Sequence, residues 1–142
     1  MTVNAKWVLV GLLFLTITGE HLASEHLNSN ARSGMSKVQI QTVLAQSNRS
    51  EDDRKRDDQS RPADILNFAG VREGMTVWDI LGGGGYYSEI TSQLVGLSGL
   101  VYLQNNTTYL GFLGTQVEDR LSGNRFPNIH HVVEEVETIS FP

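Results

Sequence analysis

The chain has 142 residues, a net charge of −5 and no cysteine. The length suggests one domain or part of one, and it is long enough to bury a hydrophobic core. The negative charge argues against a broad attraction to nucleic acid, so no nucleic-acid partner is expected. The lack of cysteine excludes disulfides, thiolate metal sites and a cysteine nucleophile.

The first 23 residues have the layout of a secretory signal peptide. Lys6 precedes an apolar run over residues 7–17. A membrane span needs about 18 or more apolar residues, so this run is short for one. Ala23 could precede the cleavage point, although His21 stands where a small residue is usual. We therefore predict a signal peptide over residues 1–23 and export to the periplasm. An uncleaved membrane anchor and a buried first helix are the alternatives.

The next two segments are polar. Residues 24–48 are rich in Ser, Asn and Gln and are predicted to form a flexible linker, with room for a short helix over residues 38–45. Residues 49–62 hold five basic and five acidic side chains. Spacing alone favours a solvated, salt-bridged segment for this charged run.

Helices and strands then alternate along the chain. Ser60 and Pro62 predict the start of a helix that ends at Gly70. Strands are predicted over residues 75–81, 100–103 and 129–133, and helices over residues 86–95 and 108–121. This order predicts an α/β fold, a Rossmann-like parallel sheet with flanking helices, apparently truncated after about three strands. The predicted domain covers residues 49–142.

Four consecutive glycines, residues 82–85, join the first of these strands to the next helix. Glycines there let a ligand approach the backbone, where the free N–H groups of a helix start can donate hydrogen bonds. In an open α/β sheet, ligands bind beyond the carboxyl ends of the strands. The alternative is a mobile turn, because glycines between a strand and a helix are common.

Three nucleotide-type sites compete for this loop. A dinucleotide site wants a third glycine where Ser88 stands, and a P-loop wants a lysine that is absent. A site for S-adenosylmethionine in class I methyltransferases has an acid late in the strand, followed by glycines two residues apart. Asp79, Gly83 and Gly85 fit that spacing, whereas Leu81 stands in place of the usual first glycine.

Residues 56–105 resemble a group of class I S-adenosylmethionine-dependent methyltransferases, many of them predicted to be exported. Several features carry this resemblance, which covers about 50 residues. They are a charged lead-in, a short glycine-containing turn, the acid Asp79, and a glycine loop that closes in Gly-Gly-Gly-Tyr; the matching positions are Arg56, Asp57, Arg61, Pro62, Gly70, Val71, Gly74, Met75 and Gly83–Tyr86. The resemblance implies that the charged run is an ordered lead-in to the site.

The same resemblance implies S-adenosyl-L-methionine as the cofactor and assigns residues to it. Asp79, Gly83, Gly84 and Gly85 would frame its methionine part and ribose, and Tyr86 would begin the helix beneath it. The family usually has an acid at the end of the second strand that binds both ribose hydroxyls. Asn105 stands at that position and carries no charge.

The resemblance covers only the first half of the family's fold. In this superfamily the fourth strand carries residues that line the methyl-transfer site, and a third strand at the sheet edge would leave that edge open to a partner. We expect either a methyltransferase of unknown acceptor or a truncated, non-catalytic module that binds S-adenosylmethionine. No catalytic residue is assigned. A nicotinamide-dependent oxidoreductase is disfavoured by Ser88 and Asn105.

No metal site is expected. His130 and His131 are adjacent on a predicted strand and should point to opposite faces, so they cannot chelate one metal ion together.

Overall fold

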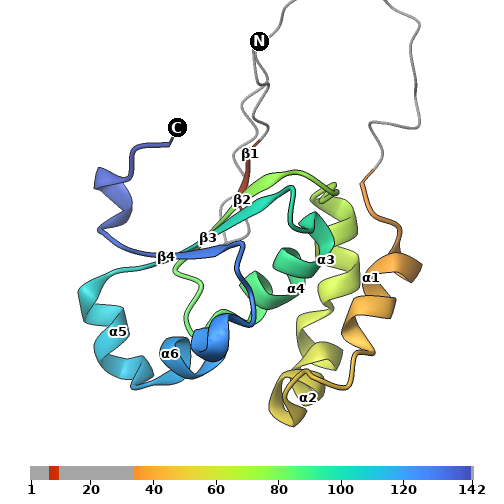
Figure 1. Ribbon diagram of the computed structural model, residues 1–142, viewed down its shortest axis with the longest axis horizontal. Coiled ribbons are helices and arrows are strands. Elements are labelled where there is room, and N and C mark those ends of the chain that lie inside the picture. The colour runs from red at the N-terminus through yellow and green to blue at the C-terminus, as the bar shows by residue number, and fades with distance from the viewer. Residues whose placement is uncertain (1–6, 10–33, 142) are drawn as a thin grey trace, which may run out of the picture.

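The computed structural model describes residues 7–9 and 34–141 of the chain (Figure 1). Within them, parallel strands form one sheet in the order β1 (Trp7–Leu9), β2 (Thr76–Ile80), β3 (Leu100–Asn105) and β4 (Ile129–Val133). The three later strands confirm the predicted parallel sheet. Strand β1 comes from the segment predicted as a signal peptide, most of which lies outside the described residues.

Helices connect the strands and share one core with them. Helix α4 (Tyr86–Val95) joins β2 to β3, and helices α5 (Thr107–Leu113) and α6 (Gln116–Leu121) join β3 to β4. Buried aliphatic side chains from the strands and these helices form the core: Val77, Ile90, Leu94, Val101, Leu103 and Val117. Since the crossovers are helical and the strands parallel, the α/β Rossmann-like class is confirmed.

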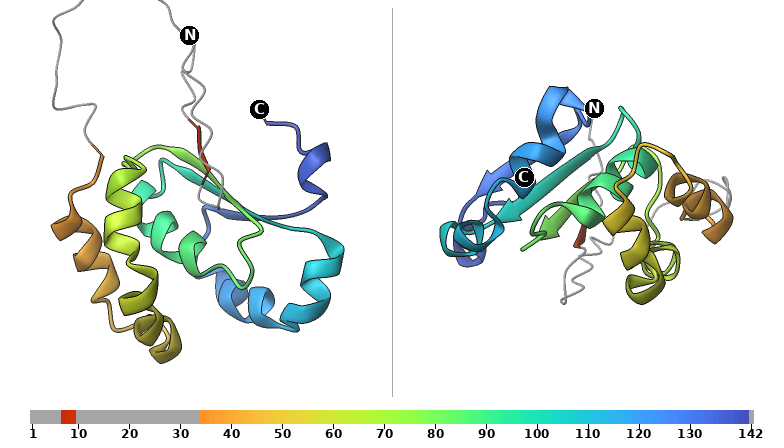
Figure 2. Two further views of the ribbon diagram at one scale, coloured as in Figure 1. Left: turned by 180° about the vertical axis from the view of Figure 1, so that it is seen from behind. Right: turned by 90° about the horizontal axis from the view of Figure 1, so that it is seen from below.

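Three earlier helices gather beside α4: α1 (Lys37–Leu44), α2 (Glu51–Ser60) and α3 (Pro62–Phe68) (Figure 2). Helix α1 begins with a capping box in which Ser36 and Gln39 exchange hydrogen bonds, and its Ile40 is fully buried. The flexible linker predicted over residues 24–48 is described only from residue 34. There the chain packs on the domain, because Ile40 belongs to the core.

The charged run forms α2 and the start of α3. Ser50 caps α2, and acidic residues fill its first turn, where they complement the helix dipole. Arg61 takes a left-handed conformation (φ 46°) between the two helices, and Pro62 begins α3. Asp53 is buried, so this segment is not simply solvated. It is an ordered lead-in, as the resemblance implied.

The helix predicted over residues 108–121 is wrong as a single element. Gly114 (φ 58°, ψ −126°) separates α5 from α6, in a conformation that residues with a side chain avoid. On the two sides of this break, Val117 of α6 is buried, whereas Phe112 of α5 is 81% exposed. The chain therefore turns at Gly114, and the residues before and after it do not form one continuous helix.

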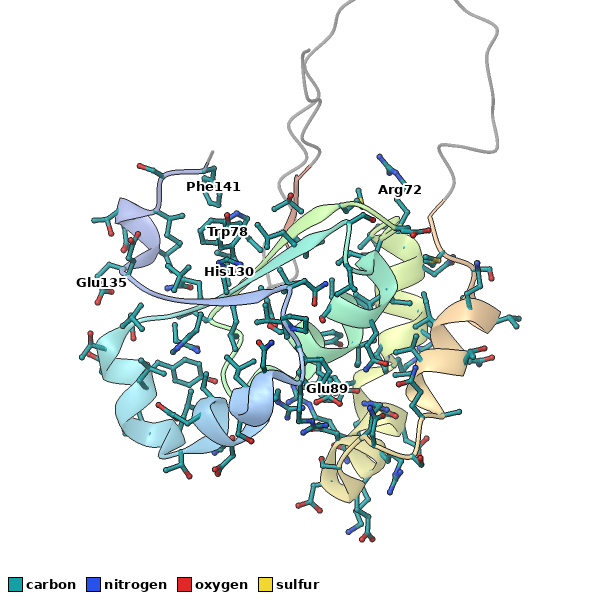
Figure 3. All side chains as sticks on the ribbon, in the orientation of Figure 1. Arg72, Trp78, Glu89, His130, Glu135 and Phe141 are labelled. Atoms are coloured by element: carbon teal, nitrogen blue, oxygen red, sulfur yellow. The ribbon has the colours of Figure 1, made fainter. Side chains whose placement is uncertain are left out.

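The face of the sheet opposite α4 carries aromatic side chains. Trp78 stacks on Tyr102 with ring centroids 4.3 Å apart, and Phe141 meets Trp78 edge-on at 5.2 Å (Figure 3). The turn η3 (Val136–Thr138) follows β4 near this face. A cavity of about 320 Å³ lies there, lined by Trp78, Tyr102, Val132, Glu134, Thr138 and Ser140. None of the helices that the structure describes is long and apolar enough to cross a membrane.

Candidate cofactor site at the glycine loop

The glycine loop, residues 81–85, leaves the carboxyl end of β2 and enters α4. Leu81, Gly83 and Gly85 have positive φ angles of 51°, 61° and 81°. Glycine reaches this region without steric cost, whereas Leu81 is strained there. The Gly85 N–H donates to the Gly82 carbonyl at 3.1 Å, and Gly85 is the N-cap residue of α4. The loop is therefore a defined turn, not a loose connection.

Asp79 lies beneath the loop and is only 3% exposed. Its carboxylate accepts a 2.7 Å hydrogen bond from the Ser88 hydroxyl on α4. A Cβ atom at residue 82 would lie 2.7 Å from the Asp79 carboxyl carbon and 2.5 Å from a Leu103 methyl carbon. The motif spacing does not use Gly82. Glycine is required at residue 82 because a side chain there would collide with Asp79 and Leu103.

Burial raises the pKa of Asp79 to about 6, although hydrogen bonds from Ser88 and the charge of Arg56 act in the opposite direction. Because the carboxyl group is enclosed, it has little surface to offer a ligand. Asp79 lies where the sequence predicted it, at the end of the strand, and it supports the loop from below.

Asn105 also lies at the loop, and it is completely buried. Its side-chain oxygen accepts the Gly83 N–H at 2.9 Å, and its side-chain nitrogen donates to the Gly83 carbonyl at 3.1 Å. The preceding residue, Gln104, holds the neighbouring part of the loop. Its side-chain oxygen accepts the Leu81 N–H at 2.9 Å, and its carbonyl accepts the Gly82 N–H at 3.0 Å. The end of β3 thus holds the backbone of residues 81–83.

Tyr86, the first residue of α4, connects the loop to the charged lead-in. Its hydroxyl donates to the Asp57 carboxylate at 2.7 Å. Arg49 meets the same carboxylate with two hydrogen bonds of 2.6 and 2.9 Å, and the Arg56 guanidinium lies 4.2 Å from the centre of the Tyr86 ring.

These contacts shift the ionisation of both groups. Burial acts to raise the pKa of Asp57, but the hydrogen bonds from Arg49 and Tyr86 outweigh it and hold this pKa below its ordinary value. Burial, together with the neighbouring Asp57 carboxylate, raises the pKa of the Tyr86 hydroxyl. The pair is therefore an ionised aspartate bonded to a neutral tyrosine at neutral pH.

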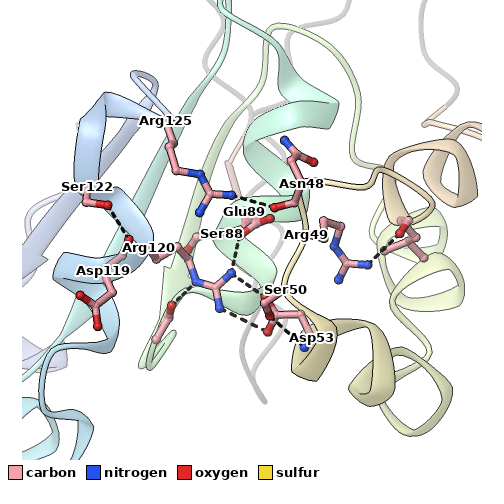
Figure 4. A network of polar contacts seen from close by, with 12 residues as sticks. Asn48, Arg49, Ser50, Asp53, Ser88, Glu89, Asp119, Arg120, Ser122 and Arg125 are labelled. Atoms are coloured by element: carbon pink, nitrogen blue, oxygen red, sulfur yellow. Dashed lines mark hydrogen bonds and ion pairs between the residues drawn. The ribbon is translucent and has the colours of Figure 1, made fainter.

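Arg120 of α6 is the central residue of a second polar cluster (Figure 4). It bonds both oxygens of Asp53 at 2.7 and 3.2 Å, pairs with Glu89, and donates to the Gly84 carbonyl. It thereby joins α2, α4, α6 and the glycine loop. Sequence reasoning missed Arg120, and the only signal was that no other Lys or Arg occurs in residues 73–124.

Side chains from α5 and α6 pack against the outer side of the loop. A Cβ atom at residue 83 would lie 3.2 Å from the Tyr109 hydroxyl, and one at residue 84 would lie 2.8 Å from the Gln116 side-chain oxygen. Within the described residues, the Gly84 N–H has no hydrogen-bond acceptor. The loop thus offers a backbone donor next to flexible polar side chains.

The protein's own packing requires glycine at residues 82, 84 and 85, because a side chain at each would meet an atom of the chain within about 3 Å. The group of the loop that is left for a cofactor is the Gly84 N–H, which has no acceptor in the described residues. Asn105 fits its implied role less well, since both ends of its amide are bonded to Gly83. The structure brings all six predicted residues, Asp79, Gly83, Gly84, Gly85, Tyr86 and Asn105, to one end of the sheet.

His130 and His131 lie on β4, where Tyr102 and Leu103 of β3 are their partners in the sheet. The His130 ring is 5.8 Å from the Tyr102 ring, while burial lowers the pKa of His131. In the part of the chain that the structure describes, no group of three His, Asp or Glu side chains gathers as metal ligands would.

No family model and no curated protein matches the sequence. The fold is similar to that of a solved structure, the crystal structure of a SAM dependent methyltransferase from Aquifex aeolicus, with a TM-score of 0.52 and 23% identity. The match covers 76% of this chain and 52% of that one, so this chain spans about half the length of that protein. The shared feature is the fold. Both have the Rossmann-like α/β arrangement.

Proposed function

We propose that the chain is a class I methyltransferase module that binds S-adenosylmethionine at the glycine loop. The observation that carries this proposal is the turn from β2 into α4, with buried Asp79 beneath it and the open Gly84 N–H above. The fold likeness to a SAM dependent methyltransferase supports it. The methyl acceptor stays unspecified.

In this proposal each residue of the loop has a separate task. Gly84 would offer its N–H to a negatively charged group of the cofactor, while Asp79 and Ser88 hold the loop in position. Tyr86 fixes the start of α4 through Asp57. When bound, S-adenosylmethionine supplies a sulfonium methyl group that a nucleophile can displace, a reaction that depends mainly on in-line positioning.

The alternative is a module that binds the cofactor without transferring its methyl group. It is motivated by the length of the match, because the chain spans about half of the similar methyltransferase. Both alternatives predict binding, and only the first predicts transfer. A methyl-release assay that follows formation of S-adenosylhomocysteine in the presence of candidate acceptors separates them.

Isothermal titration calorimetry with S-adenosylmethionine and S-adenosylhomocysteine tests the binding step. We expect binding in the micromolar to millimolar range by the full chain. Circular dichroism on the same sample shows whether the protein is folded. A folded sample that releases no heat at millimolar ligand contradicts the proposal. Gly84→Val is the matched variant, because its side chain would occupy the space before the Gly84 N–H.

Export is a separate proposal that rests on the first 23 residues. Lys6 and the apolar run after it motivate it. Expression of the full chain in a bacterium, followed by fractionation and mass spectrometry of the N-terminus, is the test. Recovery in the periplasm with a new N-terminus near residue 24 supports export, and a full-length cytoplasmic product contradicts it.

A further inference from the structure

We propose that the Asn105 side chain sets the conformation of the glycine loop and does not serve as the ribose-binding group of the site. The part of this inference that concerns ligand affinity rests on the proposed function. The part that concerns the loop rests on the structure alone.

The Asn105 side chain and the Gly83 backbone form a closed ring of hydrogen bonds. The Asn105 amide accepts from the Gly83 N–H at 2.9 Å and donates to the Gly83 carbonyl at 3.1 Å, so one side chain satisfies both backbone groups of one residue. Asn105 has no exposed surface. Removal of the Asn105 side chain would leave the buried N–H and carbonyl of Gly83 without hydrogen-bond partners, which costs free energy of folding.

Gly83 is the residue of the loop that needs such support. Its φ of 61° is left-handed, and it stands between Gly82, which packs on Asp79, and Gly84, whose carbonyl is bonded to Arg120. Without the bonds to Asn105, neither backbone group of Gly83 has another acceptor or donor in the described residues. Since glycines lose much conformational freedom on folding, this position orders only with a strong partner.

An amide can form this ring, and an ionised carboxylate cannot. Asparagine supplies one donor and one acceptor, whereas an ionised aspartate supplies only acceptors and would turn a negative oxygen towards the Gly83 carbonyl. A protonated aspartate again has a donor and an acceptor. Burial would raise the pKa of an aspartate at residue 105, so the ring should form at acidic pH and open as pH rises.

The inference also concerns the ligand. Because the amide is bonded to Gly83 and fully buried, residue 105 presents no exposed group to the ribose hydroxyls of an adenosine cofactor. We therefore expect the site to bind through the loop backbone, and an aspartate at residue 105 to weaken this binding at neutral pH by loosening the loop.

The test compares Asn105→Asp and Asn105→Ala with the full-length wild type and with Asn106→Asp. Asn106 is the matched control, because its side-chain oxygen accepts the Tyr109 N–H at 2.8 Å, which a carboxylate can also do. The change also removes the donation of Asn106 to Glu135 at 3.1 Å, which is exposed and does not involve the glycine loop. The readouts are the melting temperature from pH 4 to 8, the hydrogen-exchange rate of the Gly83 amide relative to wild type at each pH, and the affinity for S-adenosylmethionine.

We expect Asn105→Asp to lower the melting temperature by roughly 10 °C at pH 7 and to recover most of it near pH 4, relative to wild type at the same pH. The Gly83 amide should exchange at least about tenfold faster in both variants at pH 7, and in Asn105→Ala at every pH, if one hydrogen bond of ordinary strength is lost. Asn106→Asp should leave Gly83 exchange unchanged.

Three outcomes decide between the ideas. If Asn105→Asp at pH 7 is as stable as wild type and binds S-adenosylmethionine more tightly, the inference is overturned and residue 105 is a ribose position. If the stability and exchange results hold but no protein binds the ligand, the loop inference stands and the proposed function fails. If Asn105→Asp does not fold at pH 7, Asn105→Ala exchange and refolding of Asn105→Asp at pH 4 still report on the ring.

Discussion

The Tyr86 hydroxyl donates a 2.7 Å hydrogen bond to Asp57, which ties the first residue of α4 to the charged helix α2. Tyr87, the next residue, donates instead to the Ser60 carbonyl at 3.0 Å. Two adjacent tyrosines thus bind the same helix, one through a charged acceptor and one through a neutral acceptor. The contributions of the two hydrogen bonds to stability can be measured separately.

Tyr86→Phe should destabilise the protein by about 2 kcal/mol, because a hydrogen bond to an ionised group contributes more than one between neutral groups. Tyr87→Phe should lose only about 1 kcal/mol, since its acceptor is a neutral carbonyl. Urea denaturation followed by circular dichroism measures both. A Tyr87→Phe loss equal to or larger than the Tyr86→Phe loss would show that the charge of Asp57 contributes little.

The raised pKa of Asp79 predicts a pH-dependent stability. The pKa of Asp79 in the folded protein, about 6, exceeds the ordinary value of 3.8. The protonated Asp79 therefore contributes its full share to the free energy of unfolding below pH 4, and this share is lost as pH rises through 6. The loss should total about 3 kcal/mol, judged from a shift of about two pKa units.

Asp79→Asn removes this ionisation and keeps an acceptor for Ser88. We therefore expect the variant to gain stability relative to wild type between pH 4 and pH 7, as measured by urea denaturation at each pH. If the difference in free energy of unfolding between the two proteins does not change over this pH range, the pKa of Asp79 is not raised by burial. The lowered pKa of Asp57 affects both proteins alike, and its contribution is lost as pH falls below about 4.

Alanine at successive glycines should give graded effects. Gly82→Ala should lose about 2 kcal/mol because its Cβ would meet the buried Asp79 and Leu103 side chains. Gly85→Ala should lose about 1 to 2 kcal/mol, through its φ of 81° and a Cβ that would lie 3.0 Å from the Arg120 side chain. Gly84→Ala should lose under about 0.5 kcal/mol, because the Gln116 side chain that it meets is exposed and can move.

Thermal denaturation of the three variants measures this order of stability. Ligand binding should follow a different order. Gly84→Ala should weaken S-adenosylmethionine binding more than its small loss of stability suggests, since it narrows the space at the open N–H. If Gly84→Ala is the least stable of the three variants, the loop takes a different conformation.

Arg120→Ala should destabilise the protein by about 3 to 5 kcal/mol, because Asp53 and Glu89 would lose their common cation while buried. Arg125→Ala is the control. Within the described residues this exposed side chain donates to the Asn48 carbonyl at 3.0 Å and lies 5.1 Å from the Phe126 ring, and its removal should cost less than about 1 kcal/mol. Urea denaturation compares the two. Equal losses would mean that the cluster contributes no more than a surface contact.

The sequence predicted the strands β2, β3 and β4 and the helix α4, because glycines and short apolar runs mark their ends. It placed the end of β3 at residue 103, two residues early. Gln104 and Asn105 are polar, yet both are fully buried, since their amides bond to the glycine loop and, for Gln104, to the Glu134 carbonyl. Composition cannot show that a polar side chain has a distant partner.

The same limit applies to the charged run. Arg49 and Asp53 carry charges at positions that periodicity assigns to solvent, yet both are buried. The partner of Asp53 is Arg120, 67 residues further along the chain. The split between α5 and α6 was missed for a different reason, because Gly114 lies inside an apolar pattern that continues across it.

Among the described residues, the side chains that hydrogen-bond to the backbone of residues 81–84 come from β3 and α6, 22 to 36 residues later in the chain. Ordering of the loop and docking of the β3–α6 region are therefore one thermodynamic event. Any ligand that orders the loop should also protect α6 from proteolysis. Conversely, a substitution that loosens α6 should weaken ligand binding without contacting the ligand, because Arg120 of α6 bonds to the Gly84 carbonyl.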